Sequence, residues 1–462
     1  MEILWALSQQ RKLLFKGLPL MRPTLYLGTF DSEAWWRSPE VSFLPAMNNN
    51  RSQSITMGMD ELLFPLCKEH DILFTRHPMD EHLRSYLWLL GYTFTNVHCR
   101  NHVHSDDYNL HVFELLISDE SYYKQLFPKD ALISPYSILS DTSELVRRFS
   151  FYNHCPSLKT VKEVNSKMYS HELRKRLGIR NISCIAERSD ELLTLGLELL
   201  QTGHLLVKDL FGVSGKGNML ISSERMLKRI AAYLKEQENT GRETRLIIEP
   251  LLDKAEDFSC QLFITEHGEV ELISVQKMVN DSFSYLGSYP ADTWFMEGLW
   301  RNNYFSIMEE ACKDLFERGY YGDVCIDSML LTSHEIIPIV EINARKSMGL
   351  INHHLNNYLQ QYSLSSFLTF ISAGYSAEVT MLQILEMLRA NELLFTPDNK
   401  QGVIPLSSNT FFGTNDTAFA DADLKKGKLY LAAPYSSSFS EAFTLINRVK
   451  DVLKSVAIKI YN

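Results

Sequence analysis

Apolar positions recur along the chain with two periods, one typical of strands and one typical of helices. In the first third, a short apolar run at 71–75 precedes a stretch with helical spacing at 78–90. Gly91 separates that stretch from a second apolar run at 92–94. This alternation of strand, helix and strand predicts an α/β unit with a parallel sheet.

A sharper pattern begins at residue 165, where a polar triplet opens an amphipathic helix that Gly178 ends. Leucines at helical spacing then predict a helix over 189–201, and Ser222 or Ser223 caps another that reaches about residue 236. Apolar runs predict strands at 182–186, 204–208, 218–221 and 245–249. Together these elements form a compact module of strands and helices around one glycine-rich loop.

Hairpins and further helices are expected in the rest of the chain. They are hairpins at 257–278 and 323–343, helices at 305–318, 350–373 and 440–456, and strands at 402–406 and 428–433. The helix at 350–373 has a break near 363–366. Because the last elements follow a turn-rich segment at 398–402, they predict a small α/β appendage.

Composition and charge restrict the class of protein. The 462 residues are 45% hydrophobic and 22% charged, which is ordinary globular usage and excludes disorder as the main state. At about 100–200 residues per domain, this length predicts two to four domains or subdomains. The net charge of −10 excludes a general nucleic-acid-binding surface, which would have to be basic.

Cysteine usage and the N-terminus indicate the compartment. Seven widely spaced cysteines without a Cys-x-x-Cys pair favour neither a disulfide framework nor a zinc ribbon. Residues 1–12 make a poor signal peptide and are better interpreted as a first buried strand. No apolar run approaches the ~18 residues that a membrane helix needs. We therefore expect a reduced, cytoplasmic protein without a membrane or nucleic-acid partner.

The first candidate for chemistry is a strand that ends in Lys208 and continues into a glycine-rich loop, 206–217. Glycines let backbone N–H groups approach phosphate oxygens, and Lys208 and Lys216 can neutralise those oxygens. The Gly-x-x-Gly-Lys spacing does not fit a Walker loop, and a strand rather than a helix follows. A hairpin turn with solvated lysines is the alternative interpretation of this segment alone.

The second candidate lies in the hairpin at 323–343. Period-2 alternation places Glu341 and Asn343 on one face, and Asp327 joins them if the strands pair. Two carboxylates and an amide suit Mg²⁺, and Arg345 could then stabilise charge on a transferring phosphoryl group. Surface polar residues at a hairpin end are the alternative, but carboxylates within an apolar strand are costly to bury without a partner.

The apolar strand at 246–252 could offer backbone groups to an adenine, although taken alone it is better interpreted as an ordinary buried strand. Order and spacing connect the three segments. A lysine with a glycine loop, a strand ending in Glu, an Asp, and then Glu341-x-Asn343-x-Arg345 is the pattern of the ATP-grasp superfamily. The chain resembles that superfamily from about Lys167 to Asn356.

The resemblance implies a role for each matching residue. Lys208 and Arg345 are the implied catalytic residues, and Arg345 resembles the arginine that steadies an acyl phosphate. The implied ligands of Mg²⁺ (or Mn²⁺) are Asp327, Glu341 and Asn343. The implied contacts to ATP, which include a lid loop, an adenine hinge and a ribose contact, are Lys167, Lys208, Ser214, Gly215, Lys216, Gly217, Glu249, Leu251, Leu252 and Asp257.

Many superfamily members have Pro after Asn, whereas Ala344 stands here, and the segment 343–349 is similar to one subgroup. That subgroup contains the pre-ATP-grasp peptide and acyl-carrier-protein ligases of natural-product pathways, such as the pheganomycin-type peptide ligase and the butirosin glutamate–carrier-protein ligase. The similarity implies an α/β (α+β) ATP-grasp fold. Its implied parts are a pre-ATP-grasp α/β domain at 1–160, an ATP-grasp domain at 161–375 with a lid at about 180–250 and a metal-binding subdomain at about 251–375, and a C-terminal α/β appendage at 376–462.

The implied activity is that of an ATP- and Mg²⁺-dependent, ADP-forming ligase that activates a carboxylate as an acyl phosphate and joins it to an amine. Two alternatives stay open: a thiol ligase that loads an amino acid onto an acyl-carrier protein, and a catalytically silent ATP-binding regulatory protein. The implied partners are a carboxylate substrate and an amine nucleophile. An acyl-carrier protein and a second copy of the chain are further candidates.

A rival metal site lies outside this pattern. Its residues have the types that bind transition metals, but their spacing matches no standard motif. They are His98, Cys99, His102, His104, Asp106, Asp107 and His111. A loop of satisfied or solvated histidines is the favoured interpretation. The pair His353-His354 is likewise expected to be structural, with a substrate contact as the alternative.

Overall fold

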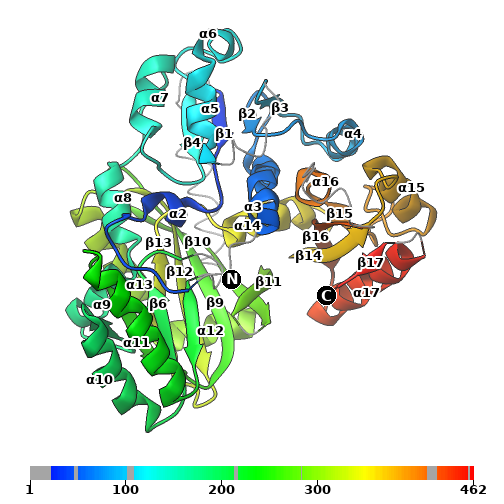
Figure 1. Ribbon diagram of the computed structural model, residues 1–462. Coiled ribbons are helices and arrows are strands. Elements are labelled where there is room, and N and C mark those ends of the chain that lie inside the picture. The colour runs from blue at the N-terminus through cyan, green and yellow to red at the C-terminus, as the bar shows by residue number, and fades with distance from the viewer. Residues whose placement is uncertain are drawn as a thin grey trace.

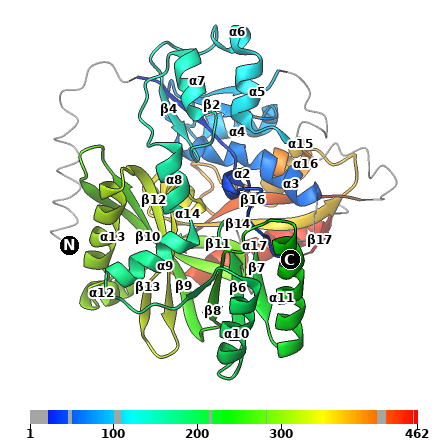
Figure 2. The same ribbon diagram turned by 60° about the vertical axis from the view of Figure 1, so that its left-hand side comes forward.

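The computed structural model of the protein describes residues 22–45, 50–100, 109–212, 217–281, 283–413, 424–455 and 458–461. Strands within these ranges form three sheets of four, nine and four strands, and Figures 1 and 2 show helices packed around them. The expected mixed α/β class is confirmed. The strand expected within residues 1–12 lies outside the described ranges. Among the described residues, no helix combines the length and the hydropathy that crossing a membrane requires.

The N-terminal sheet is wholly parallel and has the order β3-β2-β1-β4. Its strands are β1 (Thr24–Leu27), β2 (Ile72–Thr75), β3 (Thr95–His98) and β4 (Leu132–Pro135). Every residue of β2 is buried, as in a parallel sheet with both faces covered. The predicted parallel unit is confirmed. Its third strand begins only at Thr95, because the Tyr92 N–H donates to Leu87 O and continues the end of the preceding helix.

Short helices separate these strands along the chain and connect the sheet to the rest of the molecule. They are α2 (Ser32–Trp36), α3 (Asn50–Met57), the 3₁₀ helix η1 (Gly58–Leu66), α4 (Glu81–Leu89), α5 (Val112–Ser118), α6 (Glu120–Tyr123), α7 (Thr142–Phe149), α8 (Leu158–Val164) and α9 (Lys167–Arg176). Helix α9 begins where the sequence predicted, because the Ser166 side chain accepts a hydrogen bond from the Met168 N–H.

The module predicted between residues 180 and 250 forms a separate antiparallel sheet with the order β5-β8-β6-β7. Its elements are β5 (Cys184–Ala186), α10 (Ser189–Leu200), β6 (Leu205–Asp209), β7 (Asn218–Ile221), α11 (Glu224–Asn239) and β8 (Leu246–Pro250). Helices α10 and α11 lie side by side over it (Figure 1). They pack closely at Gly196, where an added Cβ would lie only 2.7 Å from Leu227 Cδ2. Every element predicted here is confirmed.

The central sheet is antiparallel and has the order β13-β12-β9-β10-β11-β14-β16-β15, with β17 beside β14. Its strands are β9 (Lys254–Ile264), β10 (Val270–Asp281), β11 (Ser284–Pro290), β12 (Gly322–Leu331), β13 (Ile336–Asn343), β14 (Ser365–Tyr375), β15 (Ile404–Pro405), β16 (Lys425–Tyr435) and β17 (Lys459–Ile460). Both predicted hairpins are confirmed, because β9 pairs with β10 and β12 with β13. Helices α12 (Thr293–Arg301) and α13 (Tyr304–Glu317) separate the two hairpins.

The helix predicted over 350–373 is wrong in its second half. Helix α14 (Met348–Gln360) ends near the expected break, and Ser363 has a left-handed φ of 59°. The following apolar residues form strand β14, which is buried along nearly its whole length inside the central sheet. The large apolar residues of this segment, at 367, 368, 370 and 371, have a spacing that also fits one face of a helix, so hydrophobic periodicity does not separate the two structures here.

The C-terminal elements complete the central sheet. They are β15, β16, β17 and helices α15 (Met381–Ala390), α16 (Asn409–Phe412) and α17 (Phe439–Lys454). The predicted strands and helix of this part are present. Strand β16 pairs with β14 from end to end, so these elements share a sheet with the two hairpins. The division into domains at 160/161 and 375/376 stays a prediction.

Glu61 in η1 joins the N-terminal part of the chain to the C-terminal part. Its buried carboxylate accepts hydrogen bonds from the backbone N–H groups of Ser408 (2.6 Å) and Asn409 (3.1 Å) and from both of their side chains. Burial raises the pKa of Glu61 to about 8. Each such hydrogen bond contributes about 0.5–1.5 kcal/mol net, and a buried donor left unpaired adds its desolvation cost.

We expect Glu61→Ala to lower the free energy of unfolding by about 3 kcal/mol or more, measured by urea denaturation. Glu386 is exposed on α15 and provides the control, because Glu386→Ala should change the same quantity by less than about 0.5 kcal/mol. Equal, small changes in the two variants would contradict the role given to Glu61.

Candidate active site

Strands β12 and β13 bring the expected metal ligands together. In their register Asp327 lies opposite Glu341, and Cys325 lies opposite Asn343. The Asn343 Nδ2 atom donates to Asp327 Oδ2 over 2.9 Å. Removal from water, followed by the negative charge of Glu341, raises the pKa of Asp327 to about 7. Two facing carboxylates repel each other here, and a divalent cation would remove that cost, so this set of oxygen donors fits Mg²⁺ or Mn²⁺.

Lys167 connects the first turn of α9 to this hairpin. Its buried Nζ atom lies 2.5 Å from Glu341 Oε1 and 3.3 Å from Gly212 O. The ammonium group therefore balances one of the two carboxylates and also contacts the residue at which the glycine-rich loop begins. The structure thus brings Lys167 together with the expected metal ligands.

Lys208 and Glu249 form a second buried pair in the sheet of β5–β8. Leu206 of β6 lies opposite Glu249 of β8, so Lys208, two residues further along β6, is the diagonal neighbour of Glu249 on the same face. The Lys208 Nζ atom lies 2.5 Å from Glu249 Oε2, and both side chains are less than a tenth exposed. Two residues that the sequence assigned separately are therefore direct partners.

Three further residues that the sequence assigned to ATP, Leu251, Leu252 and Asp257, have protein partners in the structure. The Leu251 N–H donates to His204 O over 2.8 Å, so this group of the expected adenine hinge already has a partner. Leu252 packs with Ile182 and other apolar residues in a small separate cluster. Asp257 accepts hydrogen bonds from Lys254 Nζ (2.5 Å) and Asn280 Nδ2 (2.7 Å).

Part of the glycine-rich loop lies outside the described residues. Ser214, Gly215 and Lys216 belong to that part, whereas Gly217 closes the loop. Gly217 has a φ of 85°, which favours glycine, and its carbonyl oxygen accepts from the Asp209 N–H over 2.8 Å. The hairpin that carries the loop is therefore closed at its base.

Arg345 lies at the junction between the central sheet and the N-terminal sheet, and its side chain is only 9% exposed. Its Nε and Nη2 atoms donate to Glu33 Oε1 (2.8 and 2.6 Å), and Nη2 also donates to Asn343 Oδ1 (3.0 Å). Its Nη1 atom donates to Tyr136 Oη (3.2 Å) and Lys346 O (3.0 Å). These contacts engage all five N–H donors of the guanidinium and fix its plane.

Glu33 and Tyr136 were missed in the sequence. Glu33 follows strand β1 and Tyr136 directly follows strand β4, neither of which was predicted. A weak signal exists, because short apolar runs at 25–27 and 132–133 precede Gly28 and Pro135. Residues beyond the carboxyl ends of parallel strands are general candidates for a site.

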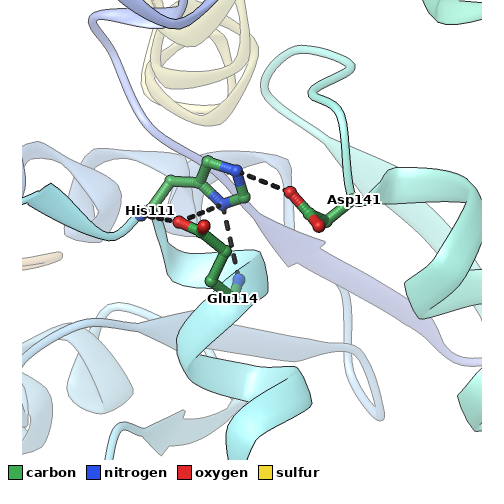
Figure 3. Close-up of side chains that lie close together, drawn as sticks. All are labelled: His111, Glu114 and Asp141. Carbon is green, nitrogen blue, oxygen red and sulfur yellow. Dashed lines mark hydrogen bonds and ion pairs between the residues drawn. The ribbon is translucent and has the colours of Figure 1, made fainter.

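The rival histidine site has a structural explanation in the residues that can be described. His111 is the N-cap of α5: its Nδ1 atom accepts from the Glu114 N–H, while the Glu114 carboxylate accepts from the His111 N–H. Its Nε2 atom lies 3.0 Å from Asp141 Oδ2, so both ring nitrogens have protein partners (Figure 3). Burial lowers the pKa of His111. His102, His104, Asp106 and Asp107 lie outside the described residues. In the other pair, His353 Nε2 lies 2.8 Å from Asn357 Nδ2.

A cavity of about 540 Å³ lies next to the site, between the segment 36–42, helix α9 and Phe211. Several arginines line it, but their charges are balanced, as in the ion pairs Arg37–Asp209 and Arg176–Asp314. The side chains that line the cavity include neither the Asp327 and Glu341 carboxylates nor the Lys208–Glu249 ion pair. The cavity therefore lies beside the candidate active site and is not its centre.

Comparison with known proteins places this geometry in context. No family model matches the chain. The [Butirosin acyl-carrier protein]–L-glutamate ligase of Niallia circulans is 24% identical over 320 residues, which are 67% of this chain and 69% of that protein.

Two solved structures share the fold over nearly the whole chain. The biotin carboxylase of Campylobacter jejuni, in a β,γ-ATP complex, has a TM-score of 0.54 at 14% identity and covers 95% of this chain and 92% of its own. The L-amino acid ligase of Bacillus licheniformis has a TM-score of 0.53 at 11% identity, with coverages of 96% and 99%. Fold and sequence similarity together indicate an ATP-grasp carboxylate ligase.

Proposed function

We propose that the protein uses ATP and Mg²⁺ to activate a carboxylate as an acyl phosphate and joins it to an amine. One observation carries this proposal: the Asp327 and Glu341 carboxylates lie opposite each other between two cationic side chains. Lys167 forms an ion pair with Glu341. Arg345 donates a hydrogen bond to Asn343, the third expected metal ligand. Such a set handles the charge of a triphosphate and of a phosphoryl group in transfer. The ligase relative and the ATP-bound neighbour in fold support it.

Asp327, Glu341 and Asn343 would hold Mg²⁺, which when bound would neutralise charge on the phosphates. The chain's own cations complete the site. Lys167 would turn from Glu341 to a phosphate oxygen once the metal balances that carboxylate. Lys208, held by Glu249, would donate to the nucleotide from the opposite sheet.

The reaction has two steps. An oxygen of the substrate carboxylate attacks the γ-phosphorus, the bond from that phosphorus to the bridging oxygen breaks, and ADP leaves with the electron pair. The amine nitrogen then attacks the acyl carbon, phosphate leaves, and the nitrogen loses a proton to solvent. The positive charge of Arg345, held in place by its protein partners, would stabilise the charge that builds on the oxygens in both steps. Closure of the sheet of β5–β8 over the nucleotide would exclude water, which would otherwise hydrolyse the acyl phosphate.

A covalent intermediate on a protein thiol is not part of this proposal. Cys325 is the cysteine on the metal hairpin, but burial raises the pKa of its thiol to about 12, so it stays protonated at neutral pH. All seven cysteines are free thiols.

A thioester product is the second candidate, because the 24% identical relative is named as a ligase of an acyl-carrier protein and L-glutamate. In that case the thiol of a carrier protein replaces the amine in the second step. The first step and its residues are the same. A homodimer stays a prediction that either product allows.

The test is to incubate the protein with ATP, Mg²⁺ and hydroxylamine in the presence of each of the twenty standard amino acids and simple carboxylates. We expect at least one carboxylate to give hydroxamate in an amount equal to the ADP released, because hydroxylamine traps an acyl phosphate. Replacing hydroxylamine by amino acids or by a pantetheinylated carrier protein then distinguishes amide from thioester. Nucleotide binding without ADP release for any carboxylate would favour the silent regulatory alternative and overturn the proposal.

A further inference from the structure

The junction between Arg345 and the N-terminal sheet has the position of a ligand site. In the order β3-β2-β1-β4 the chain leaves β1 for β2 and β3 on one side and returns to β4 on the other. The carboxyl ends of β1 and β4 therefore flank the switch point of this parallel sheet, where open α/β sheets bind their ligands. Glu33 follows one of these ends and Tyr136 follows the other.

Close packing holds the two loops together at this point. Gly28 directly follows β1 with a φ of 154°, and a Cβ there would lie 2.4 Å from Tyr136 Cβ. The rings of Phe30 and Tyr136 stack with centroids 4.0 Å apart. The Tyr136 carbonyl oxygen accepts from the Lys346 N–H over 3.0 Å, which fixes the Arg345 loop against the sheet. The position of Glu33 beside Arg345 is therefore built into the fold.

Only one of the two oxygens of the Glu33 carboxylate has a hydrogen-bond partner among the described residues. Its Oε1 atom accepts both hydrogen bonds from Arg345, whereas its Oε2 atom is fully buried and has no hydrogen-bond partner among the described residues. The side chain is 7% exposed. A buried carboxylate oxygen without a donor is costly, so a donor from a ligand would stabilise it strongly.

The geometry points to an amino-group subsite: Glu33 Oε2 receives the ammonium of an amino-acid or peptide substrate, the carboxylate of which lies at Arg345 and is activated there. This inference rests on the proposed function and deepens it, because it names the substrate class. The two charges of such a zwitterion match the adjacent Arg345 and Glu33 charges. The amine that attacks in the second step fits this anionic subsite less well, because it must be neutral to attack. The ammonium group of the carboxylate substrate keeps its positive charge through both steps.

The first test measures binding rather than turnover. Calorimetry on the full chain, with Mg²⁺ and a non-hydrolysable ATP analogue, compares each standard amino acid with its analogue that lacks the amino group. We expect at least one amino acid to bind at least ten-fold more tightly than its analogue. Glu33→Gln, which keeps an acceptor for Arg345, should remove most of that preference.

Asp31→Asn is the matched control, because it makes the same charge change two residues away, where the carboxylate accepts a hydrogen bond from the nearby Thr29 hydroxyl. It should leave the preference unchanged. Thermal unfolding of both variants checks that the fold is intact. If no amino acid binds better than its analogue, or if Glu33→Gln weakens both ligands equally, the inference is overturned.

Turnover separates this inference from the proposed function. In Glu33→Gln the KM for the amino acid should rise at least ten-fold, while the KM for ATP changes less than about three-fold. A fall in kcat alone, equal for amino acid and analogue, would mean that Glu33 only orients Arg345. Wild-type protein that binds amino acids at this subsite but releases no ADP would refute the ligase activity while leaving the subsite in place.

Discussion

Replacing Arg345 by alanine will lower kcat for ADP release about 10³-fold while changing the affinity for ATP by less than about three-fold. Loss of one preorganised group that stabilises a developing oxyanion costs about 10²–10³ in rate, and the Arg345 guanidinium is a full positive charge held in one fixed plane. Arg345 contacts Glu33, Tyr136 and Asn343. It does not contact Lys208 or Glu249, the ion pair proposed to hold the nucleotide, so the affinity for ATP should largely persist. A coupled ADP assay and calorimetry with an ATP analogue measure the two quantities.

Arg345→Ala also leaves the buried Glu33 carboxylate without its ion partner, and breaking such a pair destabilises a protein by about 3–5 kcal/mol. The double variant Glu33→Gln with Arg345→Met removes both charges and should recover much of that stability, while it stays inactive. Loss of activity in the stable double variant then cannot be ascribed to unfolding. Turnover within ten-fold of wild type in either variant would show that Arg345 is only a structural link.

The β12–β13 hairpin, with its proposed metal ligands, could be predicted from the sequence because it is local. The distance along the chain from Asp327 to Glu341 is short, a turn at 332–334 connects their strands, and period-2 alternation then fixes which side chains share a face. Lys167 was placed at the start of a helix by its capping serine, another local signal. The contact of Lys167 with Glu341, across 174 residues of sequence, is not local, and the similarity to a known family implied only that both residues belong to one ATP and metal site.

The partners of Arg345 could not be predicted from local sequence patterns. Glu33 is 312 residues away in sequence and Tyr136 is 209 residues away. Their meeting depends on how the parallel sheet docks on the central sheet, which no periodicity encodes. The prediction of strand β14 failed for a related reason. Its large apolar residues at 367, 368, 370 and 371 have a spacing that also fits a helix face, and the partners that force it to be a strand lie far along the chain.

The pairing of Lys208 with Glu249 changes how the glycine-loop segment is understood. From sequence, Lys208 was a phosphate contact and Glu249 part of an adenine hinge. As a buried ion pair 2.5 Å apart, each fixes the position of the other, so the lysine is held ready at the sheet face instead of moving freely. A lysine held this way can donate to a nucleotide without losing side-chain freedom at the moment of binding.

Glu341→Gln will raise the Mg²⁺ concentration that gives half-maximal ADP release at least ten-fold and lower the maximal rate by about 10² or more. An amide oxygen is a weaker ligand for a hard divalent cation than a carboxylate, and charge neutralisation by the metal supplies several kcal/mol in the transition state. The substitution also leaves the Lys167 ammonium, now beside a neutral side chain, to repel the metal. Titration of Mg²⁺ against the ADP-release rate measures both effects.

Glu335→Gln is the matched control, because Glu335 precedes the same strand, carries the same charge and forms only an exposed ion pair with Arg180. That variant should keep the wild-type Mg²⁺ dependence, since exposed pairs contribute about 0–1 kcal/mol. Equal Mg²⁺ curves for Glu341→Gln and wild type would place the metal away from the β12–β13 hairpin. The facing carboxylates would then need another explanation, and the Lys167–Glu341 ion pair would be a structural link between α9 and the central sheet.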